Sequence, residues 1–441
     1  MQAWHKRITA ERVREQPTEE SQQWQVGTDG WLPCPQQPRD AHLRKKGGTA
    51  GTDVSRPFDW KPHWVDSDRR RHDQKGRSPM ESSASTSSNS FSPATPVLRS
   101  VPSVSQKMNG PATSLTSLLG GPMMPELPTF SVNTKLRGRH VLVDTDLTPE
   151  ETLDLLDTAA RLKRLHRTGQ PHHYLTGKTL GLIFQHPSTR TRVSLEAGMA
   201  QLGGQAIFLG VNDLQMNRGE TIADTAQILS RYVDALVARV ADHNDLIELA
   251  TSATIPVMNG LSDLCHPLQA YADLLTMQET FGDLKGLKLA YLGDGNNMLS
   301  SLMLSGAAMG ISVSVAAPVD FAPDPKVVQH AQWLGNSTGA TIEVLTDPLE
   351  AAKDANVVYT DVHVSMGQAD AANRAVKLAP YKVSDDVMAA ADKSAVFMHC
   401  LPMHREEEVT ASVVDGPQSI VFDQAENRLH VHKALLVHTM A

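Results

Sequence analysis

The 441-residue sequence is poor in cysteine and aromatic residues and contains no long apolar run. Its cysteines, Cys34, Cys265 and Cys400, are too few for a disulfide framework and indicate a reducing, cytoplasmic compartment. No apolar stretch approaches the length of a membrane span, so no membrane partner is predicted. The net charge of −8, without a basic stripe, argues against nucleic-acid binding. No metal-ligand spacing such as H-E-x-x-H occurs, so we expect neither a metal nor a cofactor.

Residues 1–130 differ in composition from the rest of the chain. They hold five of the six tryptophans and a Ser/Thr/Pro tract over 82–96, with no persistent helical or strand periodicity. A segment of this composition cannot bury enough apolar surface to fold. We expect a disordered extension, or a non-native one if translation begins at Met108, Met123 or Met124.

From about residue 136 onward, apolar runs alternate with helical stretches. Thr148-Pro149-Glu150-Glu151 has the pattern of a capping box with proline at the first helical position. This rhythm predicts an α/β fold with two doubly wound parallel-sheet domains joined by interdomain helices. A divide is expected after a helix over 267–281, giving domains over 131–282 and 283–423. The apolar runs predict strands near 179–184, 205–209, 234–238, 255–259, 288–292, 311–316, 341–345, 356–360 and 394–398.

The segment from Ser188 to Arg192, Ser-Thr-Arg-Thr-Arg, directly follows the first of these strands and opens a helix. Hydroxyls, backbone N–H groups and a guanidinium therefore gather at a helix N-terminus, which favours a phosphate dianion. The alternative interpretation is an ordinary helix cap with two solvated arginines. Further polar clusters follow other apolar runs, and the carboxyl ends of parallel strands share one crevice. These clusters are Arg239, 266–269, 293–297, Asp361, 365–367, 399–402 and Arg428.

The order and the residue types of these clusters resemble the motifs of the ornithine carbamoyltransferase family from about residue 136 onward. The resemblance implies a first domain for carbamoyl phosphate, a second for ornithine, and a C-terminal helix over 424–441 that returns to the first. Matched by position, the phosphate is held by Ser188, Thr189, Arg190, Thr191 and Arg239. The carbamoyl group is held by His266, Gln269, Arg428 and the backbone of Cys400 and Leu401.

Each of these residues also has a plainer interpretation. A lone histidine such as His266 is commonly a cap or a core residue. Arg239 could pair with a carboxylate at its strand end, where an unpaired guanidinium would be costly. Arg428 could lie on a helix surface, and only the resemblance assigns it to the site.

The segment Gly293-Asp294-Gly295-Asn296-Asn297 also invites comparison with a dinucleotide-binding loop. That motif needs glycine at 298, where methionine stands, and an acidic residue after the next strand, which is absent. The resemblance instead implies that Asn297 holds the α-carboxylate of ornithine. Asp361, Ser365 and the Met366 backbone would hold the α-amino group.

Cys400 has three interpretations. It is a small buried residue at a strand end, a nucleophile that needs a low thiol pKa, or, as the resemblance implies, the residue that orients the side-chain amine of ornithine. Direct transfer of a carbamoyl group requires no covalent intermediate. We therefore expect Cys400 to orient the amine.

The sequence departs from the family at two positions near the substrates. His186 stands where many members carry lysine, and His363 stands where tryptophan is usual. The loop around Gln215 matches a family segment that reaches the phosphate of a neighbouring subunit. The resemblance therefore implies a homotrimer or a multiple of trimers.

The resulting expectation is a transferase that makes citrulline and phosphate from L-ornithine and carbamoyl phosphate in arginine metabolism. The rivals are carbamoyltransferases for putrescine, aspartate or N-acylornithine, and a catalytically silent regulatory relative. The aspartate enzyme carries Gly-Pro in place of His399-Cys400-Leu401-Pro402, and putrescine has no α-amino group for Asp361. The intact set of Arg190, Arg239, His266 and Cys400 argues against a silent relative. Both directions of arginine metabolism use one site, so the sequence leaves the direction open.

Overall fold

The computed structural model describes residues 134–364 and 370–441 of the chain. The expectation for residues 1–130 lies outside this described part, and so do the expected substrate contacts of Ser365 and Met366. Within the described ranges, no helix combines the length and the apolar character needed to cross a membrane.

The first sheet contains four parallel strands in the order β2-β1-β3-β4. They are β1 (Thr179–Phe184), β2 (Gln205–Gly210), β3 (Ala235–Arg239) and β4 (Val257–Leu261). The chain runs outward from β1 to β2 and then crosses to the other side of β1 to form β3. The strand order thus reverses between β1 and β3, and ligands of such sheets bind at that point, beyond the carboxyl ends.

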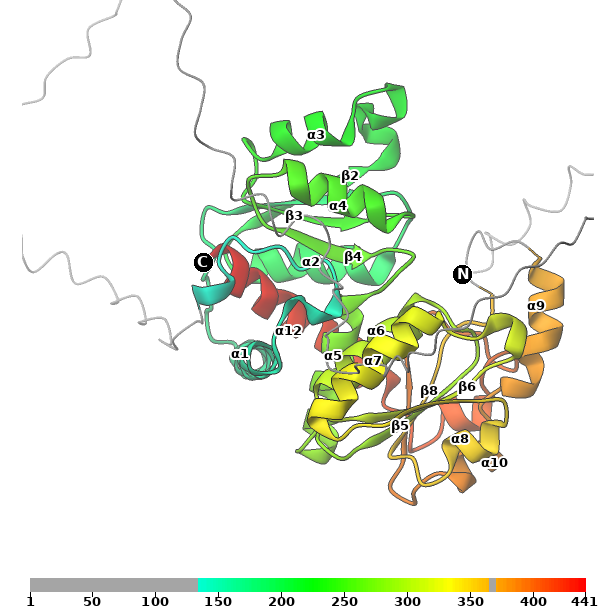
Figure 1. Ribbon diagram of the computed structural model, residues 1–441. Coiled ribbons are helices and arrows are strands. Elements are labelled where there is room, and N and C mark those ends of the chain that lie inside the picture. The colour runs from blue at the N-terminus through cyan, green and yellow to red at the C-terminus, as the bar shows by residue number, and fades with distance from the viewer. Residues whose placement is uncertain (1–133, 365–369) are drawn as a thin grey trace, which may run out of the picture. The chain divides into compact units, whose positions relative to one another are not determined.

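Helices cover both faces of the first sheet, as Figure 1 shows. On one face lie α3 (Ile222–Leu229) and α4 (His243–Ser252), and on the other lies α2 (Thr189–Gln201). The helix α1 (Pro149–Arg167) begins at the expected capping box, in which Thr148 and Glu151 each accept the other's backbone N–H. The sheet is close-packed at Gly181, where a Cβ would lie 2.7 Å from Leu236 Cδ2. Both faces of β1, β3 and β4 are buried, which explains their continuous apolar sequences, while the edge strand β2 is partly exposed.

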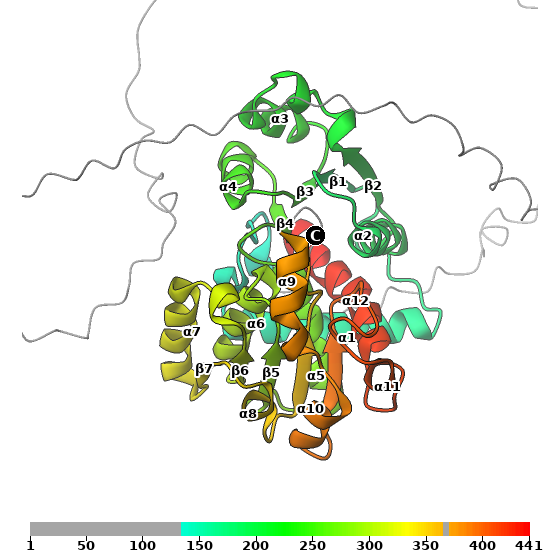
Figure 2. The same ribbon diagram turned by 90° about the vertical axis from the view of Figure 1, so that its right-hand side faces the viewer.

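The second sheet contains five parallel strands in the order β7-β6-β5-β8-β9. They are β5 (Lys288–Leu292), β6 (Ser312–Ala316), β7 (Ile342–Leu345), β8 (Val357–Thr360) and β9 (Val396–His399). Here the order reverses between β5 and β8, so Gly293 and Asp361 follow the two strands that flank the reversal. The helices around this sheet, several of them visible in Figure 2, are α6 (Asn297–Ala308), α7 (Pro325–Thr338), α8 (Pro348–Ala352), α9 (Ala371–Leu378), α10 (Asp385–Ala390) and α11 (Ala411–Val414).

Two long helices join the sheets. The helix α5 (Pro267–Phe281) follows β4 and contacts α6 of the second sheet. The helix α12 (Val421–Met440) follows the second sheet in sequence but packs against α1, α2 and α5, as Figure 1 shows. Val431, Ala434 and Leu435 on α12 are at most 1% exposed. The core of the first sheet therefore includes residues from the far end of the described chain.

The predicted fold class, two doubly wound parallel-sheet domains, is confirmed for the described residues. All nine predicted strands form, with bounds within two residues of those expected. The helix expected after Ser188 forms and ends at Gln201. The last helix begins at Val421, three residues before the expected start at residue 424.

Candidate active site

Four cationic or imidazole side chains approach one another where the first sheet reverses its strand order. Arg190 lies in the first turn of α2, directly after β1, and Arg239 ends the neighbouring strand β3 opposite Phe184. His266 immediately precedes α5, and Arg428 comes from α12. The charges of Arg190, Arg239 and Arg428 all act on the imidazole of His266, which places the four side chains in one electrostatic environment.

Hydrogen bonds join Arg428 to the turn that opens α2. Its Nη2 donates to Thr191 Oγ1 at 2.5 Å, and its Nη1 donates to Gln269 Oε1 at 2.8 Å. Ser188 caps α2 by accepting the Thr191 N–H at 3.4 Å, and its hydroxyl lies 3.0 Å from Thr191 Oγ1. Because Thr191 Oγ1 accepts from these donors, its own hydroxyl proton is directed to another acceptor.

The three arginines are desolvated and repel one another. Burial, followed by the neighbouring guanidinium of Arg190, lowers the pKa of Arg239 to about 10. The same two causes lower the pKa of Arg428 to about 10, so both side chains remain cations at neutral pH. Within the described residues, the Nε atoms of Arg190, Arg239 and Arg428 are buried without a hydrogen-bond partner. Such a cluster offers both charge and unused donors to a multivalent anion.

His266 is held as a neutral imidazole. Burial, followed by the charges of Arg428 and Arg239, lowers its pKa well below the usual value. Its backbone N–H donates to Ser301 Oγ at 2.7 Å, and Ser301 donates to Asp144 Oδ2 at 2.8 Å. The imidazole Nδ1 is buried without a hydrogen-bond partner in the described ranges. A neutral imidazole fixed in this way can donate one hydrogen bond to an oxygen on which negative charge develops.

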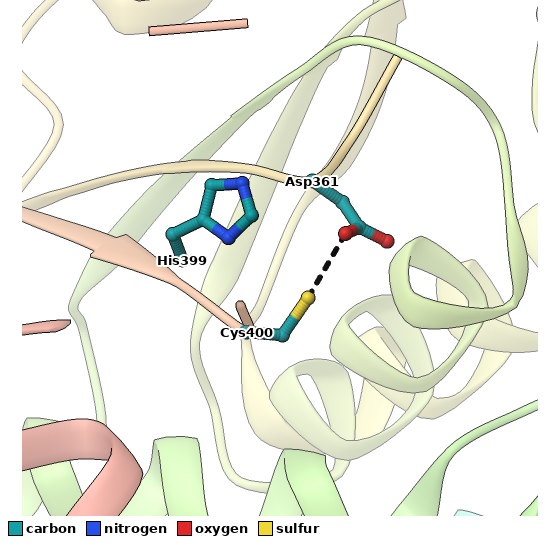
Figure 3. A group of neighbouring side chains, drawn as sticks. All are labelled: Asp361, His399 and Cys400. Atoms are coloured by element: carbon teal, nitrogen blue, oxygen red, sulfur yellow. Dashed lines mark hydrogen bonds between the residues drawn. The ribbon is translucent and has the colours of Figure 1, made fainter. Parts of the chain in front are cut away.

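The adjacent strands β8 and β9 bring Asp361 and Cys400 together, as Figure 3 shows. Asp361 follows β8 and Cys400 follows β9, and the Cys400 thiol donates to Asp361 Oδ1 at 3.0 Å. The other carboxylate oxygen, Oδ2, accepts from Asn296 Nδ2 at 2.7 Å. Asn296 also caps α6 through its Oδ1, which accepts the N–H groups of Met298 and Leu299. Asn296 therefore fixes the orientation of Asp361 relative to the start of α6.

Cys400 is a protonated thiol. Burial, followed by the negative charge of Asp361, raises its pKa well above the usual value. A nucleophilic cysteine requires the opposite shift, toward a thiolate at neutral pH. The geometry therefore favours an orienting thiol over a covalent nucleophile.

His399 and Glu408 support the backbone on either side of Cys400. His399 Nδ1 accepts the Leu401 N–H at 2.8 Å, and its Nε2 lies 3.4 Å from Glu408 Oε1, with both side chains fully buried. Leu401 itself has a positive φ of 59°. The imidazole thereby holds the Leu401 backbone beside Cys400.

Two groups in the described part of the chain carry side chains of the types that ligate metals. Asp361, His399 and Cys400 form the first, and His404, Glu407 and Glu408 form the second. In the first group the thiol proton is donated to Asp361 and His399 Nδ1 accepts from Leu401, so protein partners already engage both atoms. The expectation that the enzyme needs no metal stays a prediction.

Asn297 and Asp361 retain capacity for a polar ligand. Asn297 Nδ2 donates to Ser262 O at 2.6 Å, which leaves a second N–H and the Oδ1 atom, and the residue lies at the N-terminus of α6. Asp361 Oδ1 also accepts the Val362 N–H at 2.8 Å, while Oδ2 accepts only from Asn296 among the contacts described. An amide beside a helix N-terminus suits a carboxylate, and a carboxylate with a spare lone pair suits an ammonium group.

A buried polar network connects the two halves of the site, and the sequence analysis did not identify it. Asp273 on α5 accepts from Gln269 at 2.8 Å, Gln424 at 2.7 Å and Tyr359 at 3.0 Å. Gln424 Oε1 in turn accepts the His399 N–H at 2.9 Å. The one sequence signal was the pair of polar residues, 269 and 273, four positions apart on an otherwise apolar helix. Asn296 was likewise missed as a contact of Asp361, although its place before α6 marks a helix cap.

Three of the residues expected at or near the site are exposed to solvent, and His363 is buried. Thr189 is exposed at the start of α2, and Gln215 is exposed on a 3₁₀ turn (Gln215–Arg218), where Arg218 Nη1 lies 3.5 Å from its Oε1. His186 is exposed. His363 is only 4% exposed and beside Gly293, and burial lowers its pKa to about 4, so that it is neutral.

Comparisons with known proteins agree with this arrangement. The carbamoyl-P binding domain of aspartate/ornithine carbamoyltransferase matches residues 139–279, and the Asp/Orn binding domain of the same family matches residues 285–439. The curated ornithine carbamoyltransferase of Pyrococcus abyssi is 53% identical over 302 residues, which cover 68% of this chain and 95% of that protein.

Solved structures give the same result. The ornithine carbamoyltransferase of Pyrococcus furiosus is 52% identical, with a TM-score of 0.68 over 69% of this chain and 98% of that one. The enzyme from Gloeobacter violaceus is 43% identical, with a TM-score of 0.62 over 69% of this chain and all of that one. Two family domains match well over half of the chain, and relatives are matched over nearly their whole length. The chain therefore belongs to the aspartate/ornithine carbamoyltransferase family.

Proposed function

We propose that the chain is an ornithine carbamoyltransferase, which transfers the carbamoyl group of carbamoyl phosphate to the δ-amine of L-ornithine. The products are L-citrulline and phosphate. The observation that carries the proposal is the meeting of two half-sites of complementary chemistry. The first holds three guanidiniums and a neutral imidazole, and the second holds a carboxylate and an un-ionised thiol.

The first half-site suits the phosphate. Ser188, Thr189 and Thr191 open α2, whose N-terminal N–H groups and dipole favour an anion, and Arg190 and Arg239 supply the charge. The unpartnered Nε atoms of Arg190 and Arg239 can each donate to a phosphate oxygen. Gln215 would reach the phosphate of a neighbouring subunit.

The carbamoyl group would lie between the phosphate and Cys400. His266, Arg239 and the Thr191 hydroxyl direct donors at its carbonyl oxygen, and one such donor is typically worth about two to three orders of magnitude in rate. Gln269, oriented by Arg428, and the backbone carbonyls of Cys400 and Leu401 accept from the carbamoyl amide group. No proton needs to come from His266, because its role is to donate a hydrogen bond as a neutral group.

The second half-site suits the amino acid. Asn297 at the start of α6 binds the α-carboxylate, while Asp361 with Ser365 and the Met366 backbone binds the α-ammonium. Cys400 orients the neutral δ-amine toward the carbonyl carbon. The amine attacks that carbon, the bond from carbon to the phosphate oxygen breaks, and the departing phosphate takes up a proton that the amine loses.

The domains divide this work. Residues 131–282 with the helix 424–441 bind carbamoyl phosphate, and residues 283–423 bind ornithine. The carbamoyl-P binding domain match, 139–279, lies within the first range, while the Asp/Orn binding domain match, 285–439, extends over most of the last helix. The packing of α12 on α1, α2 and α5 supports its assignment to the first domain. The enzyme acts as a homotrimer, or a multiple of trimers, in the cytoplasm, in arginine metabolism.

A colorimetric citrulline assay on the purified full chain tests the proposal. Ornithine, putrescine, N-acetylornithine and aspartate are each offered with carbamoyl phosphate, and ureido product and phosphate are measured together. We expect equal amounts of citrulline and phosphate with ornithine and little ureido product with the other three amines. A higher rate with any of the other amines, or no product with ornithine, would refute the assignment.

A further inference from the structure

A mostly buried ion pair connects the loop that carries Asn296 and Asn297 to the helix α9. Asp294 belongs to that loop, and Arg374 lies in the first turn of α9, which faces the viewer in Figure 2. Arg374 Nη2 contacts Asp294 Oδ2, and the two side chains are 14% and 8% exposed. The guanidinium also stacks on Phe321, with its Cζ 4.2 Å from the ring centroid.

This pair differs from another ion pair on the same helix. Lys377, one turn later, contacts Asp320 at 2.5 Å, but those side chains are 40% and 60% exposed. Exposed pairs contribute little because water and salt screen them, whereas removal of one partner from a buried pair leaves an uncompensated charge. Lys377 Nζ also lies 5.9 Å from the Phe321 ring centroid, but its ion-pair partner is Asp320, so the Lys377–Asp320 pair provides a control that leaves the Asp294 contact in place.

The loop packs closely against the segment that carries Phe321. The Gly295 N–H donates to Phe321 O at 2.8 Å, and a Cβ on Gly295 would lie 2.4 Å from Pro323 N. Arg374 therefore contacts the loop itself at Asp294 and the neighbouring segment at Phe321. The loop then continues into Asn296, whose amide holds Asp361 at 2.7 Å.

The charge of Arg374 matters for Asp361 as well as for the loop. The carboxylates of Asp361 and Asp294 both act on the buried Tyr291 hydroxyl, so the two negative charges share one region of the second sheet. The Arg374 guanidinium compensates one of them. Without it, the Asp294 side chain loses its contact with α9, and any shift of the loop is passed along the backbone to Asn296.

We propose that Arg374 is a positioning residue for the amino-acid substrate, acting through Asp294 and Phe321 on Asn296, Asn297 and Asp361. The inference rests on the proposed function. It predicts an effect confined to ornithine, because the groups assigned to carbamoyl phosphate belong to the first sheet, to α5 and α12, and to the end of β9.

The test uses the full chain and four variants: Arg374→Met, Arg374→Lys, Asp294→Asn and the control Lys377→Met. For Arg374→Met we expect an ornithine KM at least ten times higher, with the carbamoyl phosphate Kd from calorimetry within twofold of the original. Arg374→Lys keeps the charge but loses the planar stacking on Phe321, so it should restore part of the ornithine KM. Lys377→Met should leave both constants within twofold.

A double variant, Arg374→Met with Asp294→Asn, shows whether the two residues act together. We expect its ornithine KM to be close to that of either single variant, because both changes break one contact. An unchanged ornithine KM in Arg374→Met, an equal loss of carbamoyl phosphate affinity, or additive effects would overturn the inference alone. If Arg374→Met fails to fold, Arg374→Lys and Asp294→Asn give the same comparison. A wild-type chain that forms no citrulline would overturn the proposed function itself, and the inference with it.

Discussion

Replacing Arg428 by glutamine should weaken carbamoyl phosphate binding while changing the stability of the protein only moderately. Arg428 is 3% exposed, and its pKa of about 10 lies about 2.5 units below the ordinary arginine value. At about 1.4 kcal/mol per unit, keeping this guanidinium charged costs about 3 kcal/mol in the folded protein. Its two charge-assisted hydrogen bonds to Thr191 and Gln269 offset this cost by about 1.5–3 kcal/mol each.

The loss of these opposing contributions therefore lowers the free energy of unfolding by about 0–3 kcal/mol. Binding has no such compensation. The anion loses one of three nearby cations and the fixed orientation of Gln269 and Thr191, which we expect to cost about 2–3 kcal/mol. That difference corresponds to a Kd about 30- to 150-fold higher.

Calorimetry with freshly dissolved carbamoyl phosphate measures the Kd, and urea denaturation measures the free energy of unfolding. The control is Arg192→Gln on α2, because Arg192 is exposed and pairs with Glu196 on the helix surface. It should leave the Kd within twofold. If Arg428→Gln loses more than about 4 kcal/mol of stability while binding carbamoyl phosphate normally, Arg428 is a structural residue and our reasoning is wrong.

Three further predictions concern the same site. Arg190→Lys keeps the charge but loses the bidentate fork, so the carbamoyl phosphate Kd from calorimetry should rise at least tenfold. The control Arg192→Lys should change this Kd less than twofold, and equal effects of the two substitutions would count against the phosphate assignment. Cys400→Ser should raise the ornithine KM and lower kcat while keeping measurable turnover. In the original chain, mass spectrometry after rapid quenching should find no carbamoyl adduct on Cys400, since a transient stoichiometric adduct would establish covalent catalysis. The rate at subsaturating ornithine should rise between pH 7 and pH 9, because the δ-amine, with a pKa of about 10.4 by analogy with lysine, loses its proton as pH rises. His266 is neutral throughout this range because its pKa is lowered. An inflection of the rate near pH 6.5 that disappears in His266→Gln would therefore contradict the lowered pKa.

The sequence predicted the strands well because most of them are buried on both faces. A buried parallel strand such as β1 reads as a continuous apolar run, and only the edge strands β2 and β7 are largely exposed on one face. The bounds of α5 were also predictable, since Pro267 marks its start and Gly282, with a φ of 85°, follows its end.

The start of α12 was less visible in the sequence. Val421 and Gln424 are buried against other elements rather than arranged on a simple amphipathic stripe, so the first turn carries no clear helical period. Arg428 could not be told from a surface arginine for a related reason. Its partners, Gln269 and Thr191, lie 159 and 237 positions away in the chain, and no local pattern can reveal them.

The strand order could not be predicted from the sequence either. Nothing in the sequence states that β1 lies between β2 and β3, or that β5 lies between β6 and β8. Only this order places Arg190 beside Arg239 and Asn296 beside Asp361. The residue types at the two half-sites were therefore predictable, while the contacts between them, and the Asp273 network that links them, required the structure.

The position of α12 has a consequence for the order in which the site can be assembled during synthesis. The strands of the first sheet are translated before residue 262, yet Arg428 and the apolar residues of α12 that complete their core come about 160 residues later. A nascent chain that has emerged only through α5 would expose the surfaces of α1, α2 and α5 that α12 covers, and it would have no complete phosphate site. Carbamoyl phosphate would therefore not stabilise a partly made chain, and that surface would remain open to chaperones or aggregation until α12 emerges.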